Sequence, residues 1–112
     1  MSLDYALYQL MLAVETLAAS PEPIQRRMEW AFLCLHTLVP DDFPEGELRG
    51  QFRAVQEAMT RVEGVGGEGS IAASAKAMSD SEASEIAKVI VALFAEIAKR
   101  DPLGEYHPER PD

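Results

Sequence analysis

The sequence predicts an all-α fold: an up-and-down bundle of four long helices, with one short helix before the last. In four separate stretches, apolar residues recur at alternating steps of three and four, the spacing of one helix face. Prolines and glycines separate these stretches, and no segment alternates apolar and polar residues convincingly as a strand would. Four apolar stripes are hidden only by packing against one another, so we expect one core formed by residues 1–100.

The first predicted helix is apolar on two opposite sides. Its core stripe contains five residues: Leu3, Leu7, Leu10, Val14 and Leu17. At roughly 100° per residue, Tyr5, Tyr8 and Leu12 project from about the opposite side. A helix in a four-helix bundle buries both sides only if another chain or a neighbouring element covers the second. We therefore expect Tyr5, Tyr8 and Leu12 to form a contact surface, used for homodimerisation or for a partner protein.

The second predicted helix follows a proline-rich turn. Ser20 is the expected N-cap, with Pro21 at the first helical position, where its missing N–H costs nothing. One face carries five apolar residues: Ile24, Met28, Ala31, Leu35 and Leu38. Five more widen the apolar arc: Trp30, Phe32, Leu33, Cys34 and Val39. This breadth predicts the central helix of the bundle.

The middle of the chain contains a third helix between two breaks. Two prolines and two aspartates within residues 40–44 cannot continue a helix. The next stripe is Leu48, Phe52, Val55, Met59 and Val62. A glycine-rich connection over residues 63–69 then leads to a short helix over residues 70–78. We expect this connection to be a mobile linker between helices.

The last predicted helix begins at a capping box. Ser79 and Glu82 have the Ser-x-x-Glu spacing in which each side chain accepts a hydrogen bond from the other residue's backbone amide. The apolar face that follows is Ala83, Ile86, Ile90, Leu93 and Ile97. Asp101 and Pro102 end the helix. Residues 101–112 contain three prolines and few apolar residues, which predicts an extended or disordered tail.

Composition excludes several classes of function. The chain has 112 residues, a formal net charge of −9, and 19 acidic residues against 10 basic ones, with no basic segment. Direct binding to nucleic acid or an anionic membrane is therefore disfavoured. No apolar run approaches the roughly 20 residues that span a bilayer, and the N-terminus lacks the pattern of a secretory signal. We expect a cytoplasmic protein.

Motifs that suggest catalysis are weak. The glycines from Gly64 to Gly69 match G-x-G-x-x-G, but the dinucleotide motif requires a preceding strand, and Glu68 places a negative charge where phosphate would sit. Cys34 falls in an apolar arc and His36 on a polar strip of the same helix, and no H-E-x-x-H sequence exists. We predict no catalytic residue, no metal and no cofactor, and hence no enzyme.

The function predicted from these observations is that of a small acidic protein-interaction or regulatory module, comparable only in size and character with accessory, antitoxin-like or immunity-like proteins. A small-molecule-binding bundle, or an enzyme with a core pocket, is the alternative, and it requires a polar-lined cavity. A more distant alternative is a nucleic-acid mimic, which requires carboxylates arrayed on one face. An exposed apolar patch, a deep polar pocket and a continuous acidic stripe would distinguish the three.

Overall fold

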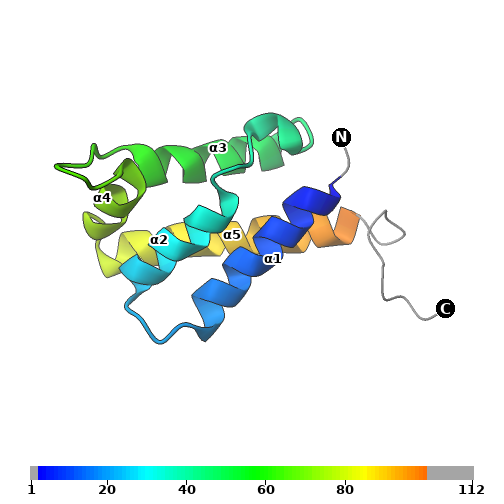
Figure 1. Ribbon diagram of the computed structural model, residues 1–112. Coiled ribbons are helices and arrows are strands. Elements are labelled where there is room, and N and C mark those ends of the chain that lie inside the picture. Colours follow the sequence, from blue (N-terminus) through cyan, green and yellow to red (C-terminus); the bar gives the residue numbers. More distant parts are fainter. Residues whose placement is uncertain (1–2, 101–112) are drawn as a thin grey trace.

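Five α-helices and one 3₁₀ turn form the part of the chain described by the computed structural model, residues 3–100 (Figure 1). In chain order they are α1 (Asp4–Ala19), α2 (Ile24–Leu35), η1 (Pro40–Asp42), α3 (Glu47–Thr60), α4 (Ser70–Lys76) and α5 (Asp80–Arg100). These residues contain no strand, and the predicted helical bundle is confirmed. The tail predicted over residues 101–112 lies outside the described residues.

Helices α1 and α2 form a hairpin that packs on α5, while α3 lies along another side of α5 (Figure 1). Helix α5 contacts α1, α2 and α3, and α2 contacts α1, α4 and α5. Helices α2 and α5 therefore share the centre of the bundle, whereas the broad apolar arc of α2 predicted that α2 alone would be the central helix. Helix α3 packs mainly against α4 and α5.

The connection from α2 to α3 is held by an aromatic stack and by hydrogen bonds from an arginine side chain. The rings of Phe43 and Phe52 stack with centroids 4.6 Å apart and planes 21° apart, and both side chains are buried. The Arg49 guanidinium donates two hydrogen bonds, of 3.1 and 2.8 Å, to the carbonyl oxygen of Phe43. These contacts join the end of η1 to the first turns of α3.

The buried side of α1 differs from its predicted core stripe. The buried residues are Ala6, Leu10, Ala13 and Leu17. Leu3, Leu7 and Val14 are only partly buried against the core. The side of α1 that is buried is therefore centred nearer Ala6 and Ala13 than predicted. Helix α1 packs against both α2 and α5, and these small side chains allow the neighbouring helices to approach closely.

The predicted start of α2 is wrong, and the predicted capping box at the start of α5 is confirmed. Helix α2 begins at Ile24 rather than at Pro21, because Pro23 disfavours a helical backbone at the residue before it. The Ser20 hydroxyl accepts a 3.3 Å bond from the amide of Glu22 within the turn, so it does not cap the helix. The capping box of α5 is present: the Ser79 amide donates to Glu82 and the Glu82 amide donates to Ser79, both at 3.0 Å.

Candidate interaction surface

The three predicted contact residues lie on the outer side of α1. Tyr5 is 50% exposed and Tyr8 is 42% exposed, while Leu12 is partly buried. The buried residues Ala6, Leu10 and Ala13 occupy another side of the same helix. The structure thus places the two tyrosines at the surface, with Leu12 beside them at the margin of the packed region.

Two hydrogen bonds hold this part of α1 against α2. The Tyr5 hydroxyl and Thr37 Oγ1 are 2.9 Å apart. The Gln9 side-chain amide donates to the backbone carbonyl oxygen of Cys34. At the other end of the hairpin, the Arg27 guanidinium donates a 2.8 Å bond to the carbonyl oxygen of Leu17. These three contacts fix an antiparallel register between the helices.

Helix α2 adds two exposed apolar residues that sequence reasoning placed in the core. Trp30 and Leu33 are both exposed, on a side of α2 away from its buried residues Met28, Ala31 and Leu35. In the sequence these two residues widen the apolar arc of the second helix. The width of an apolar arc does not tell which of its residues a neighbouring helix buries. The Arg26 guanidinium lies 5.5 Å from the centre of the Trp30 ring, a distance typical of a cation–π contact.

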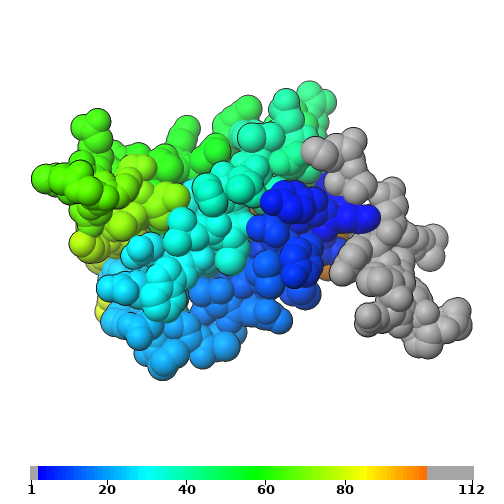
Figure 2. All heavy atoms as spheres, in the orientation of Figure 1, coloured from blue at the N-terminus to red at the C-terminus, as the bar shows by residue number. Residues whose placement is uncertain are grey.

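The exposed apolar residues of α1 and α2 lie on the outer sides of two helices that pack against each other, and Leu33 also borders the start of α4. Both helices pack on α5, and the exposed apolar residues of each lie on the sides away from the core. We call Tyr5, Tyr8, Leu12, Trp30 and Leu33 the hairpin face. Figure 2 shows α1 and α2, in blue and cyan, side by side on the near side of the molecule. The hairpin face therefore extends the surface predicted on α1 across a second helix.

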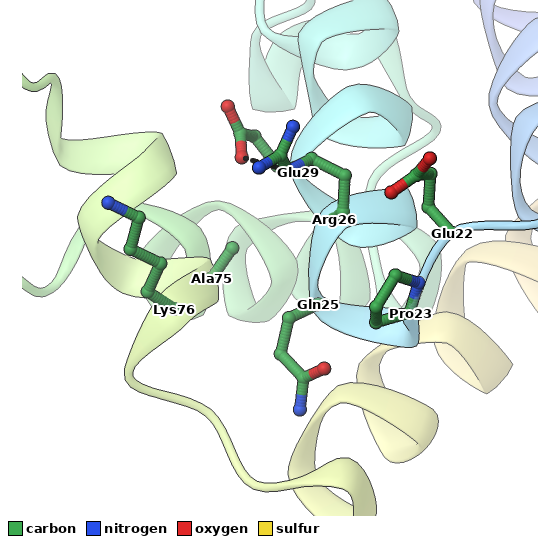
Figure 3. Close-up of a pocket in the computed structure, with 7 residues that line it drawn as sticks. All are labelled: Glu22, Pro23, Gln25, Arg26, Glu29, Ala75 and Lys76. Carbon is green, nitrogen blue, oxygen red and sulfur yellow. Dashed lines mark ion pairs between the residues drawn. The ribbon is translucent and has the colours of Figure 1, made fainter.

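A second feature is a hollow of about 360 Å³ between α2 and α4, lined by both apolar and charged residues (Figure 3). The Gln25, Arg26, Glu29 and Lys76 side chains that line it have protein partners. Arg26 pairs with Glu29 at 3.7 Å, and Lys76 pairs with Glu68 at 2.5 Å. The Gln25 side chain donates to Met78 and Asp80 across the junction with α5. The Gln25 bonds join α2 to the start of α5, whereas the two ion pairs lie within α2 and between α4 and the loop before it.

Cys34 and His36 both contact backbone carbonyl oxygens of the same helical segment. The Cys34 thiol donates to the Trp30 carbonyl oxygen, and His36 Nδ1 lies 2.8 Å from the carbonyl oxygen of Leu33. The stretch from Gly64 to Gly69 follows helix α3, not a strand. Among residues 3–100, no group of three or more His, Cys, Asp or Glu side chains is arranged to hold a metal ion.

No helix within residues 3–100 is both long enough and apolar enough to cross a membrane. Comparisons with protein-family models, with curated proteins and with solved structures gave no match to this chain.

Proposed function

We propose that this protein is an acidic interaction module that binds a partner protein through the hairpin face. The observation that carries the proposal is the exposure of aromatic and aliphatic side chains on two adjoining helices whose register is fixed by hydrogen bonds. Tyrosine and tryptophan are enriched at the centres of protein interfaces, where they contribute much of the binding energy. A surface already ordered before binding also loses less conformational entropy when the complex forms.

The charge of the chain indicates what kind of partner fits. Helix α1 carries Asp4 and Glu15 and no basic residue, within a chain of net charge −9. A partner with basic residues beside an apolar patch would meet complementary charge along the α1 edge of the hairpin face, whereas on the α2 edge Arg26 lies against Trp30 and is paired with Glu29. We therefore propose a basic partner protein. A second copy of this chain would bring like charge to the α1 edge.

The first experiment identifies what touches the hairpin face. A photo-crosslinking amino acid replaces Tyr8, or replaces Val65, which is 81% exposed on the loop before α4. In an extract of the source organism, we expect position 8 to yield an adduct with a basic protein and position 65 to yield no such adduct. Adducts only with a second copy of this chain would overturn the proposed partner and indicate homodimerisation through this face.

The second experiment measures binding of that purified partner by calorimetry. Changing Tyr5 and Tyr8 to Ser and Leu12 to Gln should weaken binding at least tenfold, while Val65→Ser leaves it unchanged. Binding should also weaken as salt is added, because the contacts along the α1 edge are electrostatic. Equal affinity for the triple variant would contradict the proposal. If that variant unfolds, its side chains belong to the core, and Tyr8→Ser alone must then show the loss of binding.

A further inference from the structure

Helix α5 presents a second stripe, made of small and apolar residues and one lysine, on its exposed side. Its buried residues are Ala83, Ile90, Leu93 and Ile97. Exposed residues recur on another side at alternating steps of four and three: Ser84, Lys88, Val91, Ala95 and Ala98. We call these five residues the α5 seam. Val91, in its middle, is 45% exposed. This spacing is that of the contact line between two helices in a coiled coil.

The α5 seam borders an apolar groove between α5 and α1. The groove has a volume of about 560 Å³ and includes Val14, Leu17 and Ala18 of α1 together with Val91, Ala92 and Ala95 of α5. Arg27 also lines it, but its guanidinium already donates to the carbonyl oxygens of Leu17 and Glu22. Because the α5 wall consists largely of small side chains, another helix can approach its backbone closely.

The charged residues in the seam and next to it indicate which kind of helix can pack there. Two ion pairs lie along the exposed side of α5: Glu85 with Lys88 at 3.3 Å, and Glu96 with Lys99 at 3.0 Å. Glu85 and Lys99 are equally distant from Ala92 along the sequence, and so are Lys88 and Glu96. When a second α5 is laid antiparallel with Ala92 opposite Ala92, each carboxylate therefore comes opposite an ammonium group.

The same charges discriminate between orientations. In the antiparallel arrangement, Glu85 comes opposite Lys99 of the second copy, and Lys88 comes opposite Glu96 of the second copy. A parallel, in-register arrangement would place each charge opposite its own kind, which is destabilising. Charge complementarity therefore selects a symmetric antiparallel contact, in which the same surface is used by both chains.

We propose that a second copy of this chain occupies the groove, with the two α5 seams packed antiparallel around Ala92. The contact covers Val91 and Ala95 of both copies, and the α1 wall of each groove covers the flank of the other copy's α5. Ion pairs between the copies offset part of the repulsion between two chains of net charge −9. This homodimer uses a different surface from the hairpin face and leaves that face available to the partner protein.

The test begins with the mass of the full chain in solution, by light scattering coupled to size-exclusion chromatography. We expect the mass of a dimer for the unaltered chain and of a monomer for Val91→Glu. Val65→Glu, a matched control at an exposed loop residue, should remain dimeric, as should the triple variant of the hairpin face. Circular dichroism should show the same helicity for all of them. A monomer at concentrations up to about 1 mM, or a Val91→Glu variant that remains dimeric, would overturn the proposal.

A charge-exchange experiment tests whether the charges of the two copies face each other, without altering the apolar side chains of the contact. One variant carries Glu85→Lys and Glu96→Lys, and the other carries Lys88→Glu and Lys99→Glu. Each variant alone should be monomeric because like charges face each other, and an equimolar mixture should give the mass of a dimer. Dimers of either variant alone, or no dimer in the mixture, would rule out the antiparallel pairing around Ala92.

Discussion

The hydroxyl of Tyr5 lies 2.9 Å from Oγ1 of Thr37, joining the first turns of α1 to the segment just after α2. The two residues are 32 positions apart in the chain. With the bond from Gln9 to Cys34, this contact sets how α1 lies against α2 and thus how Tyr5 and Tyr8 are presented at the surface. Because the bond is exposed, removing either hydroxyl leaves no buried polar atom without a partner, and the contribution of the bond to stability can be measured by substitution.

The first prediction concerns this bond. Tyr5→Phe keeps the ring and removes the hydroxyl, and Thr37→Val keeps the shape and removes the other oxygen. Each change should lower the free energy of unfolding by about 0.5–1.5 kcal/mol, the usual net contribution of one hydrogen bond. In urea denaturation the double variant should lose less than the sum of the two single losses. Simple additivity would mean that the bond contributes nothing to stability in solution.

The second prediction separates the buried side of α2 from its exposed side. Leu35 is fully buried, so Leu35→Ala should lower the free energy of unfolding by about 2–5 kcal/mol through lost burial and a cavity. Leu33 is on the same helix but exposed, and Leu33→Ala should change stability by no more than about 0.5 kcal/mol. Similar losses for the two variants in urea or thermal denaturation would contradict this assignment of faces.

The third prediction concerns the start of α5. Ser79→Ala removes the hydroxyl that accepts a bond from the Glu82 amide, and it should lower the free energy of unfolding by about 1 kcal/mol. Ser81→Ala is the matched control, since Ser81 is an exposed serine in the first turn of the same helix. The control should stay within about 0.5 kcal/mol of the unaltered protein. Equal effects of the two changes would mean that the capping box does not stabilise the helix.

The fourth prediction is a pH dependence. The hydrogen bond from the Ser79 amide, helped by Arg61 at 3.6 Å, lowers the pKa of Glu82 below its ordinary value. A carboxyl whose pKa is lower in the folded than in the unfolded state stabilises the fold fully above the unfolded pKa, and this stabilisation is lost as pH falls through the folded pKa. Glu82→Ala should therefore be less stable than the unaltered protein at neutral pH, with a difference that shrinks in acid. A difference that is constant from neutral to acidic pH would contradict this account.

The fifth prediction concerns the connection before α4. A Cβ atom at Gly64 would lie well inside van der Waals contact with the backbone carbonyl oxygen of Glu68. Gly64→Ala should therefore lower the free energy of unfolding by about 1–3 kcal/mol. Gly67→Ala is the control, because a Cβ there meets no neighbouring atom. If both substitutions are tolerated equally in thermal denaturation, the connection behaves as the mobile linker predicted from its glycine content.

The sequence by itself determined the elements whose causes are local. The periodicity of apolar residues predicted the helices, and prolines and glycines predicted the breaks between them. The box at the start of α5 followed from Ser79 and Glu82 alone, because a cap involves groups only a few residues apart. The exposed tyrosines of α1 also followed from periodicity, since at most part of a helix surface is buried in a bundle. The start of α2 was misplaced because the restriction that Pro23 imposes on the preceding residue outweighed the capping preference of Ser20.

Only the tertiary structure decided which apolar arc each neighbour covers. In α1, Ala6 and Ala13 are buried, whereas Leu7 of the predicted core stripe is only partly buried. In α2, Trp30 and Leu33 are exposed although they belong to the arc that was predicted to be buried. Periodicity defines the arcs of a helix, but the arc that is buried depends on the positions and side-chain sizes of helices distant in sequence. For the same reason the groove beside Val91 could not be read from the chain: it exists because α1 and α5 come together while no other element within residues 3–100 fills the space between them.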